Sequence, residues 1–294
     1  MTAHIPVLAA EAVQLLQPER GGIFVDCTVG RGGHSSALLS AGATRVIGLD
    51  RDLDALARAR ETLAPWRDQV ELVHADYREL DGVLDRLGVK FVDGALADLG
   101  VSSMQFEEPG RGFSFQRDEP LDMRMDRTSA TTAATLVAGS TEQELADTIY
   151  AYGEERFSRR IARALVAARR EAPIDTTGRL AAIVRRAVPT RGYQRIDPAT
   201  RTFQALRIWV NRELDGLDRF VELAARRLRA GARLVVITFH SLEDRIVKHT
   251  LRALQQRDGL VEVLTKKPMV PRDEEAERNP RARSAKLRAA ERAA

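Results

Sequence analysis

The stretch that decides the fold is Ile23-Phe24-Val25-Asp26-Cys27-Thr28-Val29-Gly30-Arg31-Gly32-Gly33-His34. Its apolar beginning is typical of a buried strand, and the residues that follow are typical of a tight turn. A helix is predicted next, from Ser35 through Ala41. Glycines after a buried strand let a ligand approach the backbone, and the following helix offers its free amides. A tight turn that binds nothing is the alternative.

Strands and helices continue to alternate after this turn. Further strands are predicted at 45–49, 70–74 and 91–97, with a helix over 53–63 that Pro65 ends. Such alternation implies a parallel sheet with right-handed crossovers. Strand character returns at 234–239, and Ser241-Leu242-Glu243-Asp244 predicts a capping box that opens another helix. The predicted fold class is therefore α/β, with a doubly wound, Rossmann-like sheet.

The segment before that last strand breaks the alternation. Residues 102–128 show no periodicity, and residues 141–186 are helical in pattern and rich in arginine. Apolar residues at three- and four-residue steps over 201–229 predict one long amphipathic helix, or two joined near Gly216. We expect a discontinuous sheet domain, 1–127 with 216–294, and an inserted, mostly helical domain, 128–215. The charged end, 272–294, is typical of a mobile tail when taken alone, with a terminal strand as the alternative.

The composition excludes several classes of protein. The 294 residues are 44% hydrophobic and 30% charged, as in ordinary globular domains. The single cysteine, Cys27, excludes a disulfide framework and the zinc-dependent base deaminases, and we interpret it as a packing residue. No apolar run is long enough to span a bilayer and no signal peptide is apparent, so we expect a cytoplasmic protein with no membrane contact. The net charge of +4 is small, so any nucleic-acid signal has to come from local clustering.

Carboxylates follow three of the predicted strands. Asp50 comes 18 residues after Gly32, where a carboxylate suits a bidentate grip on two ribose hydroxyls. Asp76 and Tyr77 are candidates for bracketing an adenine, although a helix cap explains Asp76 equally well. Asp98 follows an apolar strand, where a carboxylate without a partner is costly, so we expect it at the reactive end of a ligand.

Three nucleotide ligands compete for the glycine turn. A phosphate-binding P-loop needs a lysine, and the turn has none. The dinucleotide fingerprint needs a third glycine where Ser35 stands. S-adenosylmethionine remains, because it has ribose hydroxyls and no pyrophosphate. No histidine cluster has metal-ligand spacing, so we expect no metal.

The loop from Asp98 to Asp126 is aperiodic and rich in glycine, arginine and phenylalanine. Long ordered loops in compact domains tend to be functional. We predict that Arg111, Phe113 and Arg124 contact a substrate nucleotide by charge pairing and stacking. Anchoring of the loop to the helical core is the alternative, and it is the better interpretation for each aromatic residue taken singly.

At these residues the chain resembles the bacterial family of S-adenosylmethionine-dependent methyltransferases that act on a cytosine 4-amino group in small-subunit ribosomal RNA. Early matching runs are His4-x-Pro6-Val7-Leu8, Gly30-Arg31-Gly32-Gly33-His34-Ser35, Asp98-Leu99-Gly100-Val101-Ser102-Ser103, Arg111-Gly112-Phe113-Ser114-Phe115 and Pro120-Leu121-Asp122-Met123-Arg124-Met125-Asp126. Later ones are Tyr152-Gly153-Glu154-Glu155-Arg156-Phe157, Thr200-Arg201-Thr202-Phe203-Gln204-Ala205, Ile208-Trp209-Val210-Asn211, Phe239-His240-Ser241-Leu242-Glu243-Asp244-Arg245 and Asn279-Pro280-Arg281-Ala282-Arg283-Ser284. The resemblance therefore covers nearly the whole chain.

The resemblance implies a class I methyltransferase sheet, S-adenosyl-L-methionine as cofactor and 16S ribosomal RNA, in its decoding region, as partner. It implies cofactor contacts at Gly32, Gly33, His34, Asp50, Tyr77, Asp98 and Gln105. We predict that Asp98 is catalytic, by accepting from the target amine or by orienting the cofactor. Met104, where the family commonly has proline, is a small departure. A homodimer, and either naked RNA or an assembled small subunit as substrate, stay open.

Arginines of the insert and one histidine complete the candidate set. Arg156, Arg159, Arg160 and Arg163 are predicted to share a helix face that docks RNA, with Arg159 and Arg163 as contacts. A solvated helix surface is the alternative. His240, beside Ser241, is a candidate for the pocket rim, with a structural histidine as the alternative. Rival functions are methylation of a protein or small-molecule amine, and a non-catalytic RNA-binding module.

Overall fold

The protein, seen in a computed structural model that describes residues 6–189 and 196–294, divides into two compact units. Unit 1 consists of Met1–Gly100 and Leu214–Ala294, and unit 2 is Val101–Glu213. The sequence predicted that the first segment of the sheet domain ends at residue 127. In the structure it ends at Gly100, so the loop 101–127 belongs to unit 2. Leu121, Met123 and Met125 of this loop are buried in the core of unit 2, which explains why the loop packs with the helices.

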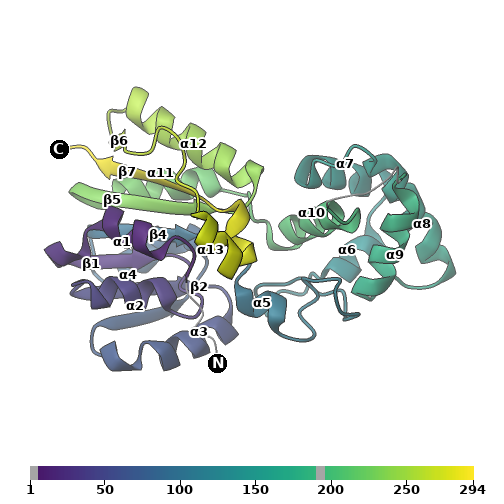
Figure 1. Ribbon diagram of the computed structural model, residues 1–294, viewed down its shortest axis with the longest axis horizontal. Coiled ribbons are helices and arrows are strands. Elements are labelled where there is room, and N and C mark those ends of the chain that lie inside the picture. The colour runs from purple at the N-terminus through teal and green to yellow at the C-terminus, as the bar shows by residue number, and fades with distance from the viewer. Residues whose placement is uncertain (1–5, 190–195) are drawn as a thin grey trace. The chain divides into compact units, whose positions relative to one another are not determined.

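Unit 1 is built on a seven-stranded sheet in the order β3-β2-β1-β4-β5-β7-β6 (Figure 1). The strands are β1 (Ile23–Asp26), β2 (Arg45–Asp50), β3 (Val70–His74), β4 (Val92–Asp98), β5 (Leu228–Thr238), β6 (Val261–Val263) and β7 (Lys286–Arg292). The first five run parallel, and β7 is antiparallel to both of its neighbours. The predicted α/β fold and its first four strands are confirmed, each strand to within one residue at either end.

Alternate residues of the central strands face opposite sides of the sheet, as the period of two requires. Val25 and Ile47 belong to one buried core and Phe24 and Val46 to another. Residues of α4 (Leu80–Arg86), α11 (Leu217–Arg226) and α12 (Ser241–Gln256) complete the first core. Residues of α1 (Ala9–Leu16), α2 (Gly33–Ser40) and α3 (Leu53–Thr62) complete the second. Cys27 is buried in the first core, so its prediction as a packing residue is confirmed.

The C-terminal residues form part of the sheet, so the alternative of a terminal strand is confirmed and that of a mobile tail is wrong. After α13 (Asp273–Arg278) and a 3-10 turn (Pro280–Ser284), β7 pairs with β5 on one side and β6 on the other (Figure 1). The charge of Arg288 suggests, from the sequence alone, a segment exposed to solvent. Its buried guanidinium instead donates from Nε to Oδ1 of Asp244 at 2.6 Å, which neutralises the charge.

Unit 2 is helical, as predicted for the insert. Its helices are α5 (Ser103–Glu107), α6 (Ala133–Gly139), α7 (Glu142–Gly153), α8 (Ser158–Glu171), α9 (Thr177–Ala187) and α10 (Ala199–Asn211). Of the two patterns left open for 201–229, two separate helices, α10 and α11, are correct, because Arg212 and Gly216 have positive φ angles of 51° and 67°. Among the described residues, no helix is both long and apolar enough to cross a bilayer.

We predict that Leu287→Ala, in β7, lowers the free energy of unfolding by roughly 2–5 kcal/mol, because it removes a fully buried side chain. Arg283→Ala, at an exposed position in the same terminal segment, is the matched control and is expected to change stability by less than about 0.5 kcal/mol. Chemical denaturation measures both. Equal stabilities for the two variants would mean that the terminal segment does not belong to the sheet.

Candidate functional site

Three carboxylates lie at one edge of the sheet in unit 1. Asp26, Asp50 and Asp98 are the last residues of β1, β2 and β4, which are parallel neighbours in the order β2-β1-β4. Their carboxyl ends therefore meet at the edge where open α/β sheets bind ligands. Asp50 and Asp98 were predicted at this edge. Asp26 was missed, although the same signal, a carboxylate after an apolar strand, marks it.

Asp26 is fully buried and holds the start of α2. One carboxylate oxygen accepts from Ser35 Oγ at 2.7 Å, and the other accepts from the Thr28 amide at 3.2 Å. Burial raises the pKa of Asp26 above its ordinary value, even though these donors and His34 act in the opposite direction. Asp26 therefore ties Thr28 of the glycine turn and Ser35 of α2 to the end of β1.

The buried His34 and the half-buried Asp98 form a pair that leaves hydrogen-bonding capacity unused. The Nε2 of His34 lies 3.5 Å from Oδ2 of Asp98, an ion-pair distance without hydrogen-bond geometry. Neither ring nitrogen of His34, nor the buried Oδ1 of Asp98, has a hydrogen-bond partner among the residues that the structure describes. Because buried polar atoms are nearly always satisfied, these atoms indicate a place for a ligand.

The carboxylates around His34 raise the pKa of its ring. Burial acts to lower the pKa of His34, but the carboxylates of Asp98 and Asp26 outweigh it, so that the pKa is raised above its ordinary value. The backbone amide of Asp98 is itself fixed, since it donates to Thr28 Oγ1 at 2.6 Å.

The carboxylate of Asp50 binds backbone amides on both of its oxygens, one of them in the glycine turn. Its Oδ2 accepts from the Gly30 amide at 2.8 Å, and its Oδ1 accepts from the Asp52 amide at 2.9 Å. The side chain stays partly exposed, and desolvation raises its pKa to about 6 despite the two amides. Each carboxylate oxygen has a second lone pair that a hydroxyl group of a ligand can use.

The glycines of the turn are required by close packing as well as by conformation. Gly32 has a φ of 84°, and a side chain there would meet Leu63 Cγ at 2.9 Å. A side chain at Gly33 would meet Pro6 Cγ at the same distance. Gly32 is also the N-cap of α2, and no described side chain caps this helix, so the first amides stay open to a ligand.

The two residues predicted to bracket an adenine both make contacts within unit 1. Asp76 caps the 3-10 turn Tyr77–Glu79 and pairs with Arg78 Nε at 2.7 Å, so the helix-cap alternative is confirmed for it. Tyr77 is buried with its ring 4.7 Å from that of Phe220, and burial raises its pKa well above the usual range. This ring is therefore engaged in the core of unit 1.

The predicted loop contacts all lie in unit 2 and hold the loop together. Arg111 is only 2% exposed, and its guanidinium donates to the carbonyls of Arg124 and Met125. Arg124 pairs with Asp122 through two hydrogen bonds of 2.7 and 2.8 Å. Phe113 is buried in the helical core, which is the anchoring alternative. The buried Gln105 accepts from the Ser102 amide through Oε1 at 3.0 Å, which closes the turn before α5.

The arginines of the insert divide into structural and exposed ones. Arg169 donates to two carbonyls at the end of α6, and Arg179 donates to two carbonyls near the end of α8. Arg159 and Arg163 are exposed on α8, and Arg163 pairs with Glu142 at 3.6 Å. Arg156 precedes the first residue of α8, so its predicted place on that helix face is wrong.

His240 caps a helix. Its Nδ1 accepts from the Glu243 amide at 3.4 Å, and Glu243 in return accepts from the amide of His240 at 3.3 Å. The predicted capping box of α12 exists, but it begins one residue earlier than expected, at His240 and not at Ser241. The structural alternative for this histidine therefore has direct support.

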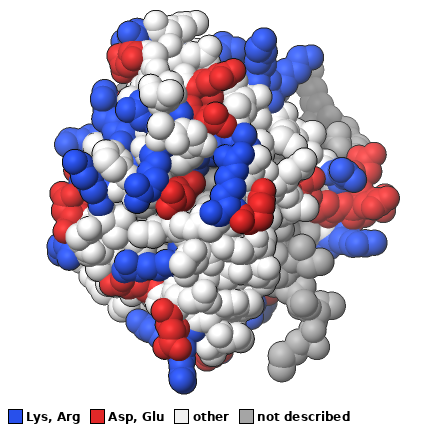
Figure 2. All heavy atoms as spheres, turned by 90° about the vertical axis from the view of Figure 1, so that its left-hand side faces the viewer, with Lys and Arg blue, Asp and Glu red and all other residues white. Residues whose placement is uncertain are grey.

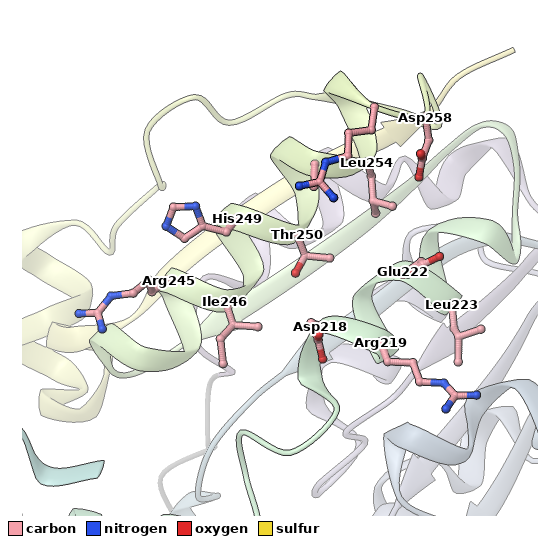
Figure 3. A pocket seen from close by; sticks show the side chains of 12 residues that line it. Asp218, Arg219, Glu222, Leu223, Arg245, Ile246, His249, Thr250, Leu254 and Asp258 are labelled. Carbon is pink, nitrogen blue, oxygen red and sulfur yellow. The ribbon is translucent and has the colours of Figure 1, made fainter. Parts of the chain in front are cut away.

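A groove lies between α11 and α12 (Figure 3). Its lining carries charges of both signs, including Asp218, Arg219, Glu222, Arg245 and Asp258, and none of the predicted site residues is among them. The carboxyl ends of β1, β2 and β4 are a better candidate for a ligand site than this groove, because His34 and Asp98 have buried polar atoms there without a described partner.

Comparison with known proteins places the whole chain in one family. The model of the MraW methylase family matches residues 1–293. "Ribosomal RNA small subunit methyltransferase H" of Cyanothece sp. is 52% identical over 290 residues, which cover 98% of this chain and 94% of that protein. The protein of the same name from Sorangium cellulosum is 52% identical over 289 residues, covering 98% and 90%. A crystal structure of an rRNA methylase from Streptococcus thermophilus has a TM-score of 0.44 at 12% identity, covering 97% of this chain and 94% of that one. The chain belongs to the MraW methylase family.

Proposed function

We propose that this chain transfers a methyl group from S-adenosyl-L-methionine to the exocyclic N4 amine of a cytidine in 16S ribosomal RNA. The observation that carries the proposal is the family match over residues 1–293, together with relatives named for methylation of the small ribosomal subunit. Bacterial ribosomal RNA is made in the cytoplasm, which we propose as the location of the enzyme.

The residues at the carboxylate edge fit the cofactor. Asp50 would accept from the two ribose hydroxyls through the free lone pairs of its carboxylate. Gly32 and Gly33 would admit the ligand to the open amides of α2, and Asp98 would face its charged end. Tyr77 and Gln105 remain proposed contacts by resemblance alone. S-adenosylmethionine supplies the methyl group from a sulfonium, and the sulfur keeps the electron pair of the C–S bond.

Asp98 is the proposed catalytic residue. A cytosine 4-amino group is a weak nucleophile, because its lone pair is delocalised into the ring. An acceptor that binds one of its hydrogens holds the lone pair toward the methyl carbon, so that positioning supplies much of the rate. When the N–C bond forms, the nitrogen becomes acidic and releases one proton to Asp98 or to water. Oδ1 of Asp98, which is buried without a described partner, is the atom that we assign to this contact.

We predict that Asp98→Ala abolishes methylation while the fold survives, because it removes the side chain that accepts from the target amine. The assay incubates each protein with labelled S-adenosylmethionine and, separately, bare 16S RNA, assembled small subunits and total protein. Nucleoside digestion then locates the label. The proposal expects N4-methylcytidine from at least one RNA arm with the wild type only.

Asp93→Asn is the matched control, since Asp93 lies on the same strand away from its carboxyl end and pairs with the exposed Arg229. Label in protein would favour the rival amine methyltransferase. An RNA complex without label in any arm would favour a non-catalytic binding module. Near-normal methylation by Asp98→Ala would contradict the role of Asp98.

The exposed arginines of α8 are the proposed RNA contacts. Arg159, Arg160 and Arg163 are exposed, while Arg111, Arg124, Arg169 and Arg179 are occupied within unit 2. Elsewhere the charges are mixed, and the face in Figure 2 carries Lys and Arg side chains among Asp and Glu. An exposed cationic helix face suits phosphates, which bind such groups electrostatically.

We predict that Arg159→Glu with Arg163→Glu weakens RNA binding and flattens its salt dependence, because each lost phosphate contact removes about 0.7–0.9 from the slope of log K against log salt. Affinity for S-adenosylmethionine should stay unchanged. Arg67→Glu, a charge reversal at an exposed arginine of unit 1, is the control. RNA affinity equal to that of the control variant would place the RNA surface elsewhere.

A further inference from the structure

We propose that the imidazole of His34 is a positioning residue for methyl transfer, which holds the carboxylate of Asp98 toward the target amine. The inference rests on the proposed function, since it assigns the group that orients the proposed catalytic residue.

The position of the ring is fixed by its surroundings. His34 is the second residue of α2, and its side chain is only 6% exposed. Directly after it, Ser35 Oγ donates to Asp26, which ties the first turn of the helix to the end of β1. Thr28, in the turn between β1 and α2, accepts from the Asp98 amide through Oγ1, which ties this turn to the end of β4. Hydrogen bonds therefore hold the residue after His34 and the backbone of Asp98, while the ring itself makes none to the described residues.

The Nε2 of His34 faces Asp98 at a distance that can shorten. At 3.5 Å the two atoms are within ion-pair distance but farther apart than in a normal hydrogen bond, and both ring nitrogens lack a close partner among the described residues. Catalytic hydrogen bonds are often long without substrate and tighten in the reactive complex. A small rotation of Asp98 would bring Oδ2 to Nε2 and leave Oδ1 to accept from the amine.

Three carboxylates from three elements act on the ring. Asp98 comes from β4, Asp26 from β1 and Glu275 from α13, and all three favour its protonated form. Glu275 is fixed in turn, since its Oε1 accepts from the Leu8 amide at 2.8 Å. Among these three carboxylates, Asp98 is the one whose oxygen lies within 3.5 Å of the ring nitrogen Nε2, so it is the group that the ring can orient.

The pairing is tested in the free protein by nuclear magnetic resonance. We predict that the pKa of the His34 ring falls in Asp98→Asn, because burial, which lowers it, then acts with less opposition. The exposed His249 of α12 is the internal control, and its ring resonances should have the same chemical shifts in both proteins at a given pH. An unchanged His34 titration would overturn the proposal. Because this measurement needs no RNA and no turnover, it stands even if the proposed substrate is wrong.

A pair of substitutions separates positioning from packing. The side-chain amide that His34→Gln introduces can reach the place of Nε2 and keeps a donor there, whereas His34→Leu keeps only the bulk. Single-turnover methylation should fall by about 100-fold in His34→Leu, as for misplaced catalytic groups, and recover in part in His34→Gln. Equal rates in the two variants, or a wild-type rate in His34→Leu, would contradict the role.

Discussion

The constraint on which unit 1 depends is the desolvation of carboxylates at one edge of a parallel sheet. Asp26, Asp50 and Asp98 end neighbouring strands, and each would be costly to bury without compensation. The turn after β1 and the start of α2 supply this compensation. The Gly30 amide donates to Asp50, the Ser35 hydroxyl donates to Asp26, and the His34 ring lies beside Asp98. The glycine turn is therefore both a candidate ligand cradle and the element that makes the carboxylate edge stable.

The strand ends were predictable because their signal is local. An apolar run followed by a carboxylate marks a strand and the edge that it reaches, and this placed Asp50 and Asp98 correctly. Asp26 carries the same signal but stands inside the glycine motif, where the turn residues dominate the pattern. Its contact with Ser35 and its proximity to His34 depend on the path of the chain through the turn, which no spacing rule specifies.

Side-chain pairings were not predicted from the sequence. The strand β7 looked like a charged tail because the partner of Arg288, Asp244, lies 44 residues earlier in the chain. Arg111 and Arg124 suggested contacts with a substrate nucleotide, whereas their guanidinium groups bind carbonyls and Asp122 within unit 2. These partners lie only 2 to 14 residues away, but the loop has no periodicity that would indicate the pairing. Arginine is thus an ambiguous signal in this chain, and only exposure separates the residues of α8 that face solvent from those that hold loops and helix ends.

The affinity for S-adenosylmethionine between pH 5 and 7 tests the carboxylate edge most directly. Desolvation raises the pKa of Asp50 to about 6, and only the ionised carboxylate accepts fully from two ribose hydroxyls. The dissociation constant measured by calorimetry should therefore rise as the pH falls through about 6, by up to about tenfold per unit. In Asp50→Asn this step should disappear and binding should be weak throughout. A wild-type affinity that does not change with pH, or the same step in Asp50→Asn, would contradict cofactor binding at this edge.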